Sequence, residues 1–199
     1  IERGMVCSQK VLIIFGSPCS GKSTLTNALS ESSRNFVPVK LLRDYSKDPL
    51  NDSQYEVCQP PQFDEALEQG ELQHWHVRYD RRYGLRRKAI EDVHDAGLIP
   101  VVQIGRYLHV LSLFASLDKE VQAFMVRLDL SRENFIGRLQ KRHLTLDDPA
   151  VESRIEAYEE EVAEYYCVGP KRVTFELNTG NLSLEECKNT ILDAVLSKK

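Results

Sequence analysis

The sequence predicts one three-layer α/β domain, in which helices cover both faces of a central, mainly parallel five-stranded sheet. Short apolar runs alternate with segments of helical spacing from residue 11 to the end of the chain. The first apolar run leads into a glycine-rich turn and then a helix. A chain of 199 residues with 42% hydrophobic residues is long enough for one compact core with a small insertion.

The N-terminal third opens with a strand, a turn and a helix. Residues 11–15 form a continuous apolar run ended by glycine, which is typical of a strand buried on both faces. Residues 21–30 have the spacing of a helix, and residues 37–42 predict a second strand. Residues 44–61 are rich in Asp, Asn, Ser and Pro, which indicates a loop with short strand pieces.

Glycine marks the ends of the next two helices. Residues 63–69 predict a short helix closed by Gly70, and residues 85–96 predict a helix ended by Gly97. A strand over 99–104, a helix over 107–117 and a strand over 121–128 follow.

The C-terminal third carries clear helix-start signals. Ser131 caps one predicted helix, and Pro149 stands in the first turn of a long amphipathic one. After a last strand over 172–177, Ser183 and Glu186 form a capping box for the final helix.

Composition excludes several classes of protein. The net charge of -4 argues against general nucleic-acid binding. No apolar run approaches the roughly 20 residues of a membrane span, and no charged-then-apolar leader is present, so neither a membrane nor secretion is expected. The five cysteines contain no CxxC pair, so we expect a reducing cytoplasm and neither a disulfide framework nor a zinc site. The oligomeric state, monomer or homodimer, stays open.

The turn after the first strand carries the most specific motif. The residues from 16 to 23 fit G-x-x-x-x-G-K-[ST] without mismatch, and the expected nucleotide contacts are Gly16, Ser17, Pro18, Cys19, Ser20, Gly21, Lys22, Ser23 and Thr24. Backbone N–H groups and the helix N-terminus would hold phosphates, Lys22 would reach the β and γ phosphates, and Ser23 would ligate Mg²⁺. The motif predicts a P-loop NTPase fold that uses ATP and Mg²⁺. Cys19 is either a small filler or a redox switch.

Other motifs narrow the class of P-loop protein. The chain lacks the Asn-Lys-x-Asp base reader of GTPases, and the strand that ends at residue 104 carries Gln103 where a motor ATPase would have an acidic ligand. A small kinase remains, in which a phosphorylated substrate lies beside the loop.

Arginines supply candidate partners for phosphate groups. Six basic residues lie between 78 and 88, and Arg106 follows a predicted strand end. Arg78 and Arg82 are candidates for the acceptor site, whereas Arg87 and Lys88 suit a solvated helix face. A lid over about 132–155 would carry three more arginines that neutralise the migrating phosphoryl group: Arg138, Arg142 and Arg154.

At these residues the chain resembles the guanylate kinase family of nucleoside monophosphate kinases. The motif continues as Gly21-Lys-Ser-Thr-Leu25, Gly70-Glu71-Leu72 and Tyr83-Gly84 keep the family spacing, and Arg138-Leu139 with Arg142 matches its lid motif. The resemblance implies adenine contact by Asn178 and acceptor contact by Arg43, Tyr55 and Tyr83. It also implies a core over about 10–42 and 97–199 and an acceptor-binding insertion over about 43–96.

The guanine-reading residues of that family are not kept. A family glutamate falls on His74, its serine falls near Arg86, and its acidic pair falls on Gln103 and Gly105. The segment around Trp75 and His76 also resembles ribose 1,5-bisphosphate phosphokinase, whose acceptor has no base. His74 and His76 would then be phosphate donors, or else partly buried histidines that are satisfied within the fold.

The sequence therefore predicts an ATP-dependent kinase that transfers the γ-phosphoryl group to a small phosphorylated metabolite, with a nucleoside monophosphate first. A sugar phosphate and a modified nucleoside or nucleic acid are the alternatives. A hydroxyl acceptor would need a carboxylate, for which Asp44 and Asp80 are candidates. A non-catalytic guanylate kinase-like binding module is the alternative of another class, and a switch ATPase is a third.

Overall fold

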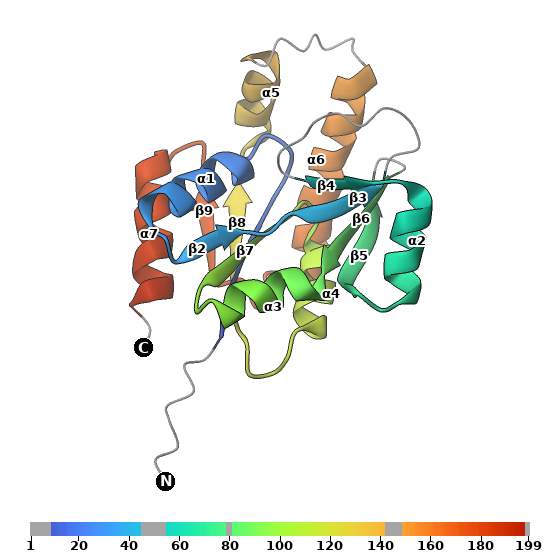
Figure 1. The fold of residues 1–199 in the computed structure, drawn as a ribbon. Helices are drawn as coiled ribbons and strands as arrows, with labels where there is room; N and C mark the ends of the chain where they lie inside the picture. The colour runs from blue at the N-terminus through green and yellow to red at the C-terminus, as the bar shows by residue number, and fades with distance from the viewer. Residues whose placement is uncertain (1–8, 45–54, 79–80, 142–148, 198–199) are drawn as a thin grey trace.

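A computed structural model describes residues 9–44, 55–78, 81–141 and 149–197. Its main sheet has five parallel strands in the order β2-β7-β1-β8-β9 (Figure 1). The strands are β1 (Lys10–Phe15), β2 (Phe36–Pro38), β7 (Ile99–Ile104), β8 (Gln122–Asp129) and β9 (Phe175–Asn178). This arrangement confirms the predicted fold class, and it puts the turn after β1 in the middle of the sheet.

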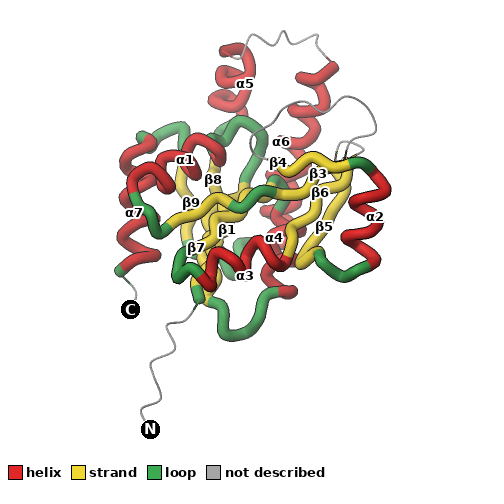
Figure 2. Tube along the Cα trace, viewed as in Figure 1, coloured by secondary structure: helices red, strands yellow, loops and turns green. Residues whose placement is uncertain are grey.

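Helices cover both faces of the main sheet, as the predicted layers require (Figure 2). Alternate residues of β1 point to opposite faces. Leu12 and Ile14 pack with α1 (Lys22–Ser32) and α7 (Leu184–Leu196). Phe15 packs on the other face with residues of α4 (Tyr107–Ser116) and α6 (Pro149–Val168).

A second sheet is inserted between β2 and β7, in the order β4-β3-β6-β5. Its strands are β3 (Leu41–Asp44), β4 (Tyr55–Cys58), β5 (Leu72–Arg78) and β6 (Arg81–Arg86). The helices of this insertion are α2 (Pro60–Glu68) and α3 (Arg87–Asp95). In Figure 1, this sheet and α2 lie on the side of the molecule away from α7.

Several predicted elements need correction. The strand expected over 37–42 is two strands in two different sheets, β2 and β3. The antiparallel hairpin of β5 and β6 was not predicted, and β6 takes the first residues expected in the helix over 85–96. The last strand begins at Phe175 rather than 172, because Arg172 adopts a left-handed conformation with φ of 62°.

The two faces of the second sheet have different partners. On one face Leu42, Cys58 and the α2 residues Phe63 and Ala66 form a small apolar core. Cross-strand neighbours share a face, so the pairs Arg43↔Tyr83 and His76↔Tyr83 place these three residues together on the other face. Tyr83 also belongs to the core cluster that includes α4. The face that carries Arg43, His76 and Tyr83 therefore points toward the main sheet.

The predicted lid corresponds to α5 (Arg132–Lys141) and the start of α6, with residues 142–148 outside the described part. The Asn134 N–H donates to the Ser131 hydroxyl at 3.3 Å, as the predicted cap requires. Phe135 of α5 stacks on Tyr158 of α6 with ring centroids 4.5 Å apart. This stacking joins α5 to α6.

The sequence also predicts that the chain has neither a membrane span nor a disulfide framework, and the structure bears on both points for the residues it describes. None of their helices combines the length and the apolar character that crossing a membrane requires. Their four cysteines, Cys19, Cys58, Cys167 and Cys187, are free thiols.

Candidate functional site

The turn between β1 and α1 has the backbone shape that its glycines predict. Gly16 has φ of 141°, Gly21 has φ of 96°, and Cys19 adopts the left-handed region with φ of 61°. The Lys22 ammonium donates to the Gly16 and Ser17 carbonyls, each at 2.8 Å. The loop therefore curls around the ammonium group of Lys22, which is the first residue of α1.

Gly16 is packed too closely for any side chain. A Cβ at this position would lie 2.5 Å from the Leu128 carbonyl oxygen of β8. We therefore predict that Gly16→Ala lowers Mg-ATP affinity by at least about tenfold, since the loop must move from its phosphate-binding shape. Isothermal titration calorimetry measures this loss.

Gly137 offers the matched control for that substitution. A Cβ there, in the middle of α5, would meet nothing within 4 Å. Gly137→Ala should keep the affinity for Mg-ATP and raise the free energy of unfolding by about 0.5–1 kcal/mol. Unchanged binding by Gly16→Ala would contradict the role assigned to this close approach.

The Ser23 hydroxyl, the predicted metal ligand, extends from the start of α1 to a residue near the end of a neighbouring strand. It donates to Oε1 of Gln103 on β7 at 3.2 Å. Both groups present oxygen, which is the donor atom that Mg²⁺ prefers. Gln103 therefore occupies the strand end where a motor ATPase would carry a carboxylate, and it orients the serine.

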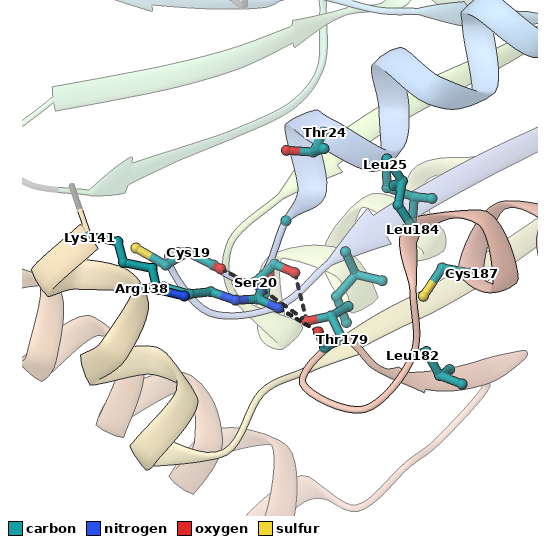
Figure 3. A pocket seen from close by; sticks show the side chains of 12 residues that line it. Cys19, Ser20, Thr24, Leu25, Arg138, Lys141, Thr179, Leu182, Leu184 and Cys187 are labelled. Atoms are coloured by element: carbon teal, nitrogen blue, oxygen red, sulfur yellow. Dashed lines mark hydrogen bonds between the residues drawn. The ribbon is translucent and has the colours of Figure 1, made fainter.

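A pocket of about 370 Å³ opens beside the loop on the side of α7 (Figure 3). Its lining includes the predicted nucleotide contacts Cys19, Ser20, Gly21 and Thr24 together with apolar side chains from α1 and α7. Thr179 from the turn after β9 closes one wall, and its hydroxyl donates to the Ser20 carbonyl at 3.0 Å. No sequence motif points to Thr179, because only the fold brings this residue to the loop.

Arg138 joins α5, which forms part of the predicted lid, to this pocket. Its guanidinium donates to the Cys19 carbonyl at 2.9 Å and to the Thr179 hydroxyl at 3.2 Å. Figure 3 shows the side chain reaching from α5 toward the loop. The side-chain oxygen of Asn178 accepts from the Gly180 N–H at 3.0 Å, and the predicted contact of Asn178 with adenine stays a prediction. The neighbouring Thr179 lines the pocket.

The remaining lid and loop residues are placed as follows. Arg154 is half-buried on α6, Pro18 is half-buried in the loop, and Ser17 is buried. Arg142 lies outside the described residues, so its predicted role stays a prediction.

Five of the predicted acceptor residues share one face of the second sheet. Strand pairing and alternation place on it Arg43 of β3, Tyr55 of β4, His74 and Arg78 of β5, and Tyr83 of β6. The Arg43 guanidinium lies over the Tyr55 ring at 4.0 Å, and the rings of Tyr55 and Tyr83 are 5.6 Å apart. Guanidinium and phenol groups bind phosphate oxygens, so this face can hold an anionic acceptor.

Arg78 connects this face with the end of β7. Its guanidinium fills the space beside Gly105, where any Cβ would collide with it. The adjacent Arg106 is held by α6, because it donates to Oε2 of Glu164 at 2.6 Å and 3.0 Å. Glu164 also accepts from the Leu108 N–H at 2.6 Å. Arg106 therefore fixes α4 to α6, a structural role that the sequence did not indicate.

Arg82 does not join the other predicted acceptor residues. It lies on the opposite face, where it forms ion pairs with Asp44 and Asp64 and covers the Phe63 ring at 4.6 Å. Alternation along β6 explains the difference, because neighbouring residues of a strand point to opposite faces. Asp44, a candidate base for a hydroxyl acceptor, is held in the same ion pair, and Asp80 lies outside the described residues.

His74 and His76 meet a third histidine, His109 of α4. Burial lowers the pKa of His74 to about 4 and that of His76 to about 3, with further contributions from neighbouring histidines and, for His76, from Arg78 and Arg106. Both rings are therefore neutral near pH 7, which weakens the expectation that either donates to phosphate as a cation.

The sequence did not predict a network of buried ion pairs around Arg127. Arg127 of β8 has 1% exposure and pairs with Asp129 at 2.9 Å, Glu176 at 3.2 Å and Glu161 at 3.4 Å. Its guanidinium also lies over the Tyr165 ring at 4.0 Å. Burial raises the pKa of the Glu161 carboxyl, and the neighbouring Arg127 and Lys22 oppose that rise. The network anchors the strand end on which Gly16 rests.

Comparison with known proteins establishes the fold. No family model and no curated protein sequence matches the chain. The solved guanylate kinase from Anaplasma phagocytophilum is similar with a TM-score of 0.65 and 17% identity, over 96% of this chain and 87% of that one. The structure of APE1195 has a TM-score of 0.54 and 14% identity, over 96% of this chain and 97% of that one. The chain therefore has a guanylate kinase-like fold.

Proposed function

We propose that this protein is an ATP-dependent kinase that phosphorylates a small, already phosphorylated metabolite. The observation that carries the proposal is the loop from Gly16 to Ser23, whose backbone curls around the Lys22 ammonium at the start of α1. A second, arginine-bearing face lies near the end of β7, the strand beside β1. Two anion sites that converge on the carboxyl end of a parallel sheet suit a transfer between two phosphates.

The residues present fit ATP and Mg²⁺. Gly16 packs on the Leu128 carbonyl of β8 with no space for a Cβ, so the close packing would hold the loop in one shape, with its N–H groups available to phosphate oxygens. The pocket lined by Thr24, Leu25 and Thr179 would take the adenine. Ser23 and Gln103 would hold the metal ion, directly or through water. When bound, Mg²⁺ supplies positive charge to the β and γ oxygens.

The chain's own cations carry the rest of the reaction. Lys22 would turn from its loop carbonyls to the γ-phosphate, and Arg138 would keep the lid over the loop. Arg43 and Arg78, with Tyr55 and Tyr83, would orient the acceptor phosphate in line with the γ-phosphorus. A phosphate acceptor is already an anion, so the transfer needs no general base.

A nucleoside monophosphate is the first acceptor class, in keeping with the guanylate kinase-like fold. A sugar bisphosphate is the second. The observation that favours it is the cluster of His74, His76 and His109, which occupies the acceptor face with neutral rings where guanine would require a carboxylate.

Acceptor-dependent ADP release tests this proposal. Purified protein with Mg-ATP would be given each nucleoside monophosphate, ribose 1,5-bisphosphate and a nucleoside, with an acceptor-free sample as control. The proposal predicts release that one phosphorylated acceptor raises at least about tenfold. Equal hydrolysis in all samples would indicate a switch ATPase, and no turnover in any would favour a binding module. Either result would contradict the proposal.

Arg43 should determine acceptor affinity. We predict that Arg43→Gln raises the KM for the acceptor by at least about tenfold and leaves the KM for ATP within about twofold, because the guanidinium lies on the acceptor face. Steady-state kinetics with each substrate varied separately gives both values. Arg87→Ala, which removes an exposed arginine of α3, is the control and should change neither. Parallel changes in both KM values for Arg43→Gln would refute this assignment.

A further inference from the structure

Three histidines from two elements meet at the edge of the acceptor face. His74 and His76 alternate on β5 and so share a face, and His109 stands in the first turn of α4. The His76 and His109 rings are stacked with centroids 4.2 Å apart, and those of His74 and His76 are 5.5 Å apart. Each ring offers one nitrogen, and the three nitrogens lie within 4.8 Å of one another.

Each ring also has a buried nitrogen that makes no hydrogen bond within the described part of the chain. These atoms are Nε2 of His74, Nδ1 of His76 and Nε2 of His109. A buried polar atom without a partner costs free energy, and such atoms are rare in folded proteins. Ring stacking satisfies no nitrogen lone pair. Three neighbouring rings, each with such an atom, therefore call for a shared partner.

We propose that His74, His76 and His109 form a binding site for a divalent transition-metal ion, Zn²⁺ in the first place, with an open fourth position. Three imidazoles are a donor set that zinc accepts in open sites. With Zn–N bonds of about 2.0–2.1 Å, tetrahedral ligands stand about 3.4 Å apart. The rings would therefore have to close by about 1.4 Å at most from their present separation of up to 4.8 Å.

The surrounding charges shape what this site can hold. Arg78 of β5 and Arg106 before α4 lower the pKa of His76 and His109, whereas Glu164 of α6 acts in the opposite sense on His109. Tyr83 of β6 packs flat on His76 with ring centroids 5.4 Å apart. Two guanidiniums disfavour a bare dication and favour an anion beside it. The fourth ligand is therefore hydroxide or another anion rather than a neutral group.

This site differs from the magnesium site of the proposed kinase reaction and does not depend on it. Mg²⁺ prefers oxygen ligands, which Ser23 and Gln103 supply. The nitrogen ligands of the histidine cluster select a softer ion. The cluster also lies on the insertion and α4, and none of its members belongs to the phosphate loop.

Metal binding to the full chain tests the proposal without any nucleotide. Protein freed of metal with a chelator would be titrated with Co²⁺ while visible absorption is recorded, and then with Zn²⁺ in competition. We expect one equivalent of Co²⁺ with the intense bands of a four-coordinate ion, displaced by one equivalent of Zn²⁺. Zn²⁺ should also raise the melting temperature. Absence of stoichiometric binding by the wild-type chain would overturn the proposal.

Single substitutions decide whether the histidines are the ligands. His74→Gln and His109→Gln should each lower the affinity for Zn²⁺ at least about tenfold and remove the four-coordinate Co²⁺ bands. His94→Gln is the matched control, because His94 on α3 contacts the Lys10 carbonyl at 2.9 Å and lies outside the cluster. It should bind like wild type. Circular dichroism checks that each variant is folded, and unchanged binding by folded His74→Gln and His109→Gln would refute the site.

Discussion

Lys22→Ala should lower the rate of phosphoryl transfer by about 10²–10³-fold or more and leave the fold intact. Lys22 lies at the N-terminus of α1, and its ammonium group donates to two loop carbonyls at 2.8 Å. It is the loop cation that can follow the charge of the γ-phosphate into the transition state. Coupled detection of ADP release measures the rate, and circular dichroism measures the fold.

Lys88→Ala is the matched control for that substitution. Lys88 lies on α3 with an exposed side chain paired to Asp92 at 2.8 Å, so its removal should change neither transfer nor melting temperature by a measurable amount. A folded Lys22→Ala protein that retained wild-type transfer would mean that the loop does not carry the chemistry.

Arg127→Met should lower the free energy of unfolding by about 3–5 kcal/mol. Arg127 is the buried cation among three carboxylates, and Glu161 beside it has only 1% exposure. Methionine fills much of the same volume and leaves that carboxylate without its cation. Urea unfolding at pH 7 gives the difference. A loss under about 1 kcal/mol would show that the network does not stabilise the sheet.

The same variant predicts a pH dependence. Burial already raises the pKa of Glu161 in the folded protein above its unfolded value, and loss of Arg127 should raise it further. A carboxyl whose pKa is higher when folded favours folding at low pH, and this contribution is lost as the pH rises through the folded pKa. The deficit of Arg127→Met should therefore be smaller at pH 5 than at pH 8. Adding Glu161→Gln should recover part of it and remove that pH dependence.

The phosphate loop could be predicted because its signal is local. Eight consecutive residues from Gly16 to Ser23 fix the turn, its glycine conformations and the place of Lys22. The capping box of Ser183 and Glu186 was also predictable, and the structure confirms both of its hydrogen bonds. In each case the partners lie within one turn of chain, so no knowledge of the fold is needed.

The second sheet was not predictable in the same way. In β5 the usual alternation is inverted, because the apolar Trp75 and Val77 are exposed and His76 is buried. Buried and exposed positions therefore cannot be assigned from the apolar residues of this strand. Arg82 could not be separated from Arg78 without the strand register, since that register alone decides which face each side chain takes.

The remaining site residues could not be predicted because they are brought together by contacts between residues far apart in the sequence. Thr179 joins the pocket through Ser20, 159 residues away in the chain. His109 joins His74 and His76 only because α4 packs on β5. The absence of CxxC pairs argued against zinc, but it carried no information on histidines that the fold brings together.

Equilibrium binding of Mg-ATP to the purified chain tests the central claim most directly. Isothermal titration calorimetry should show one nucleotide per chain, with micromolar affinity for wild type and for Gly137→Ala, and at least about tenfold weaker binding for Gly16→Ala. The absence of measurable affinity for any Mg-nucleotide in the folded wild-type protein would contradict the account.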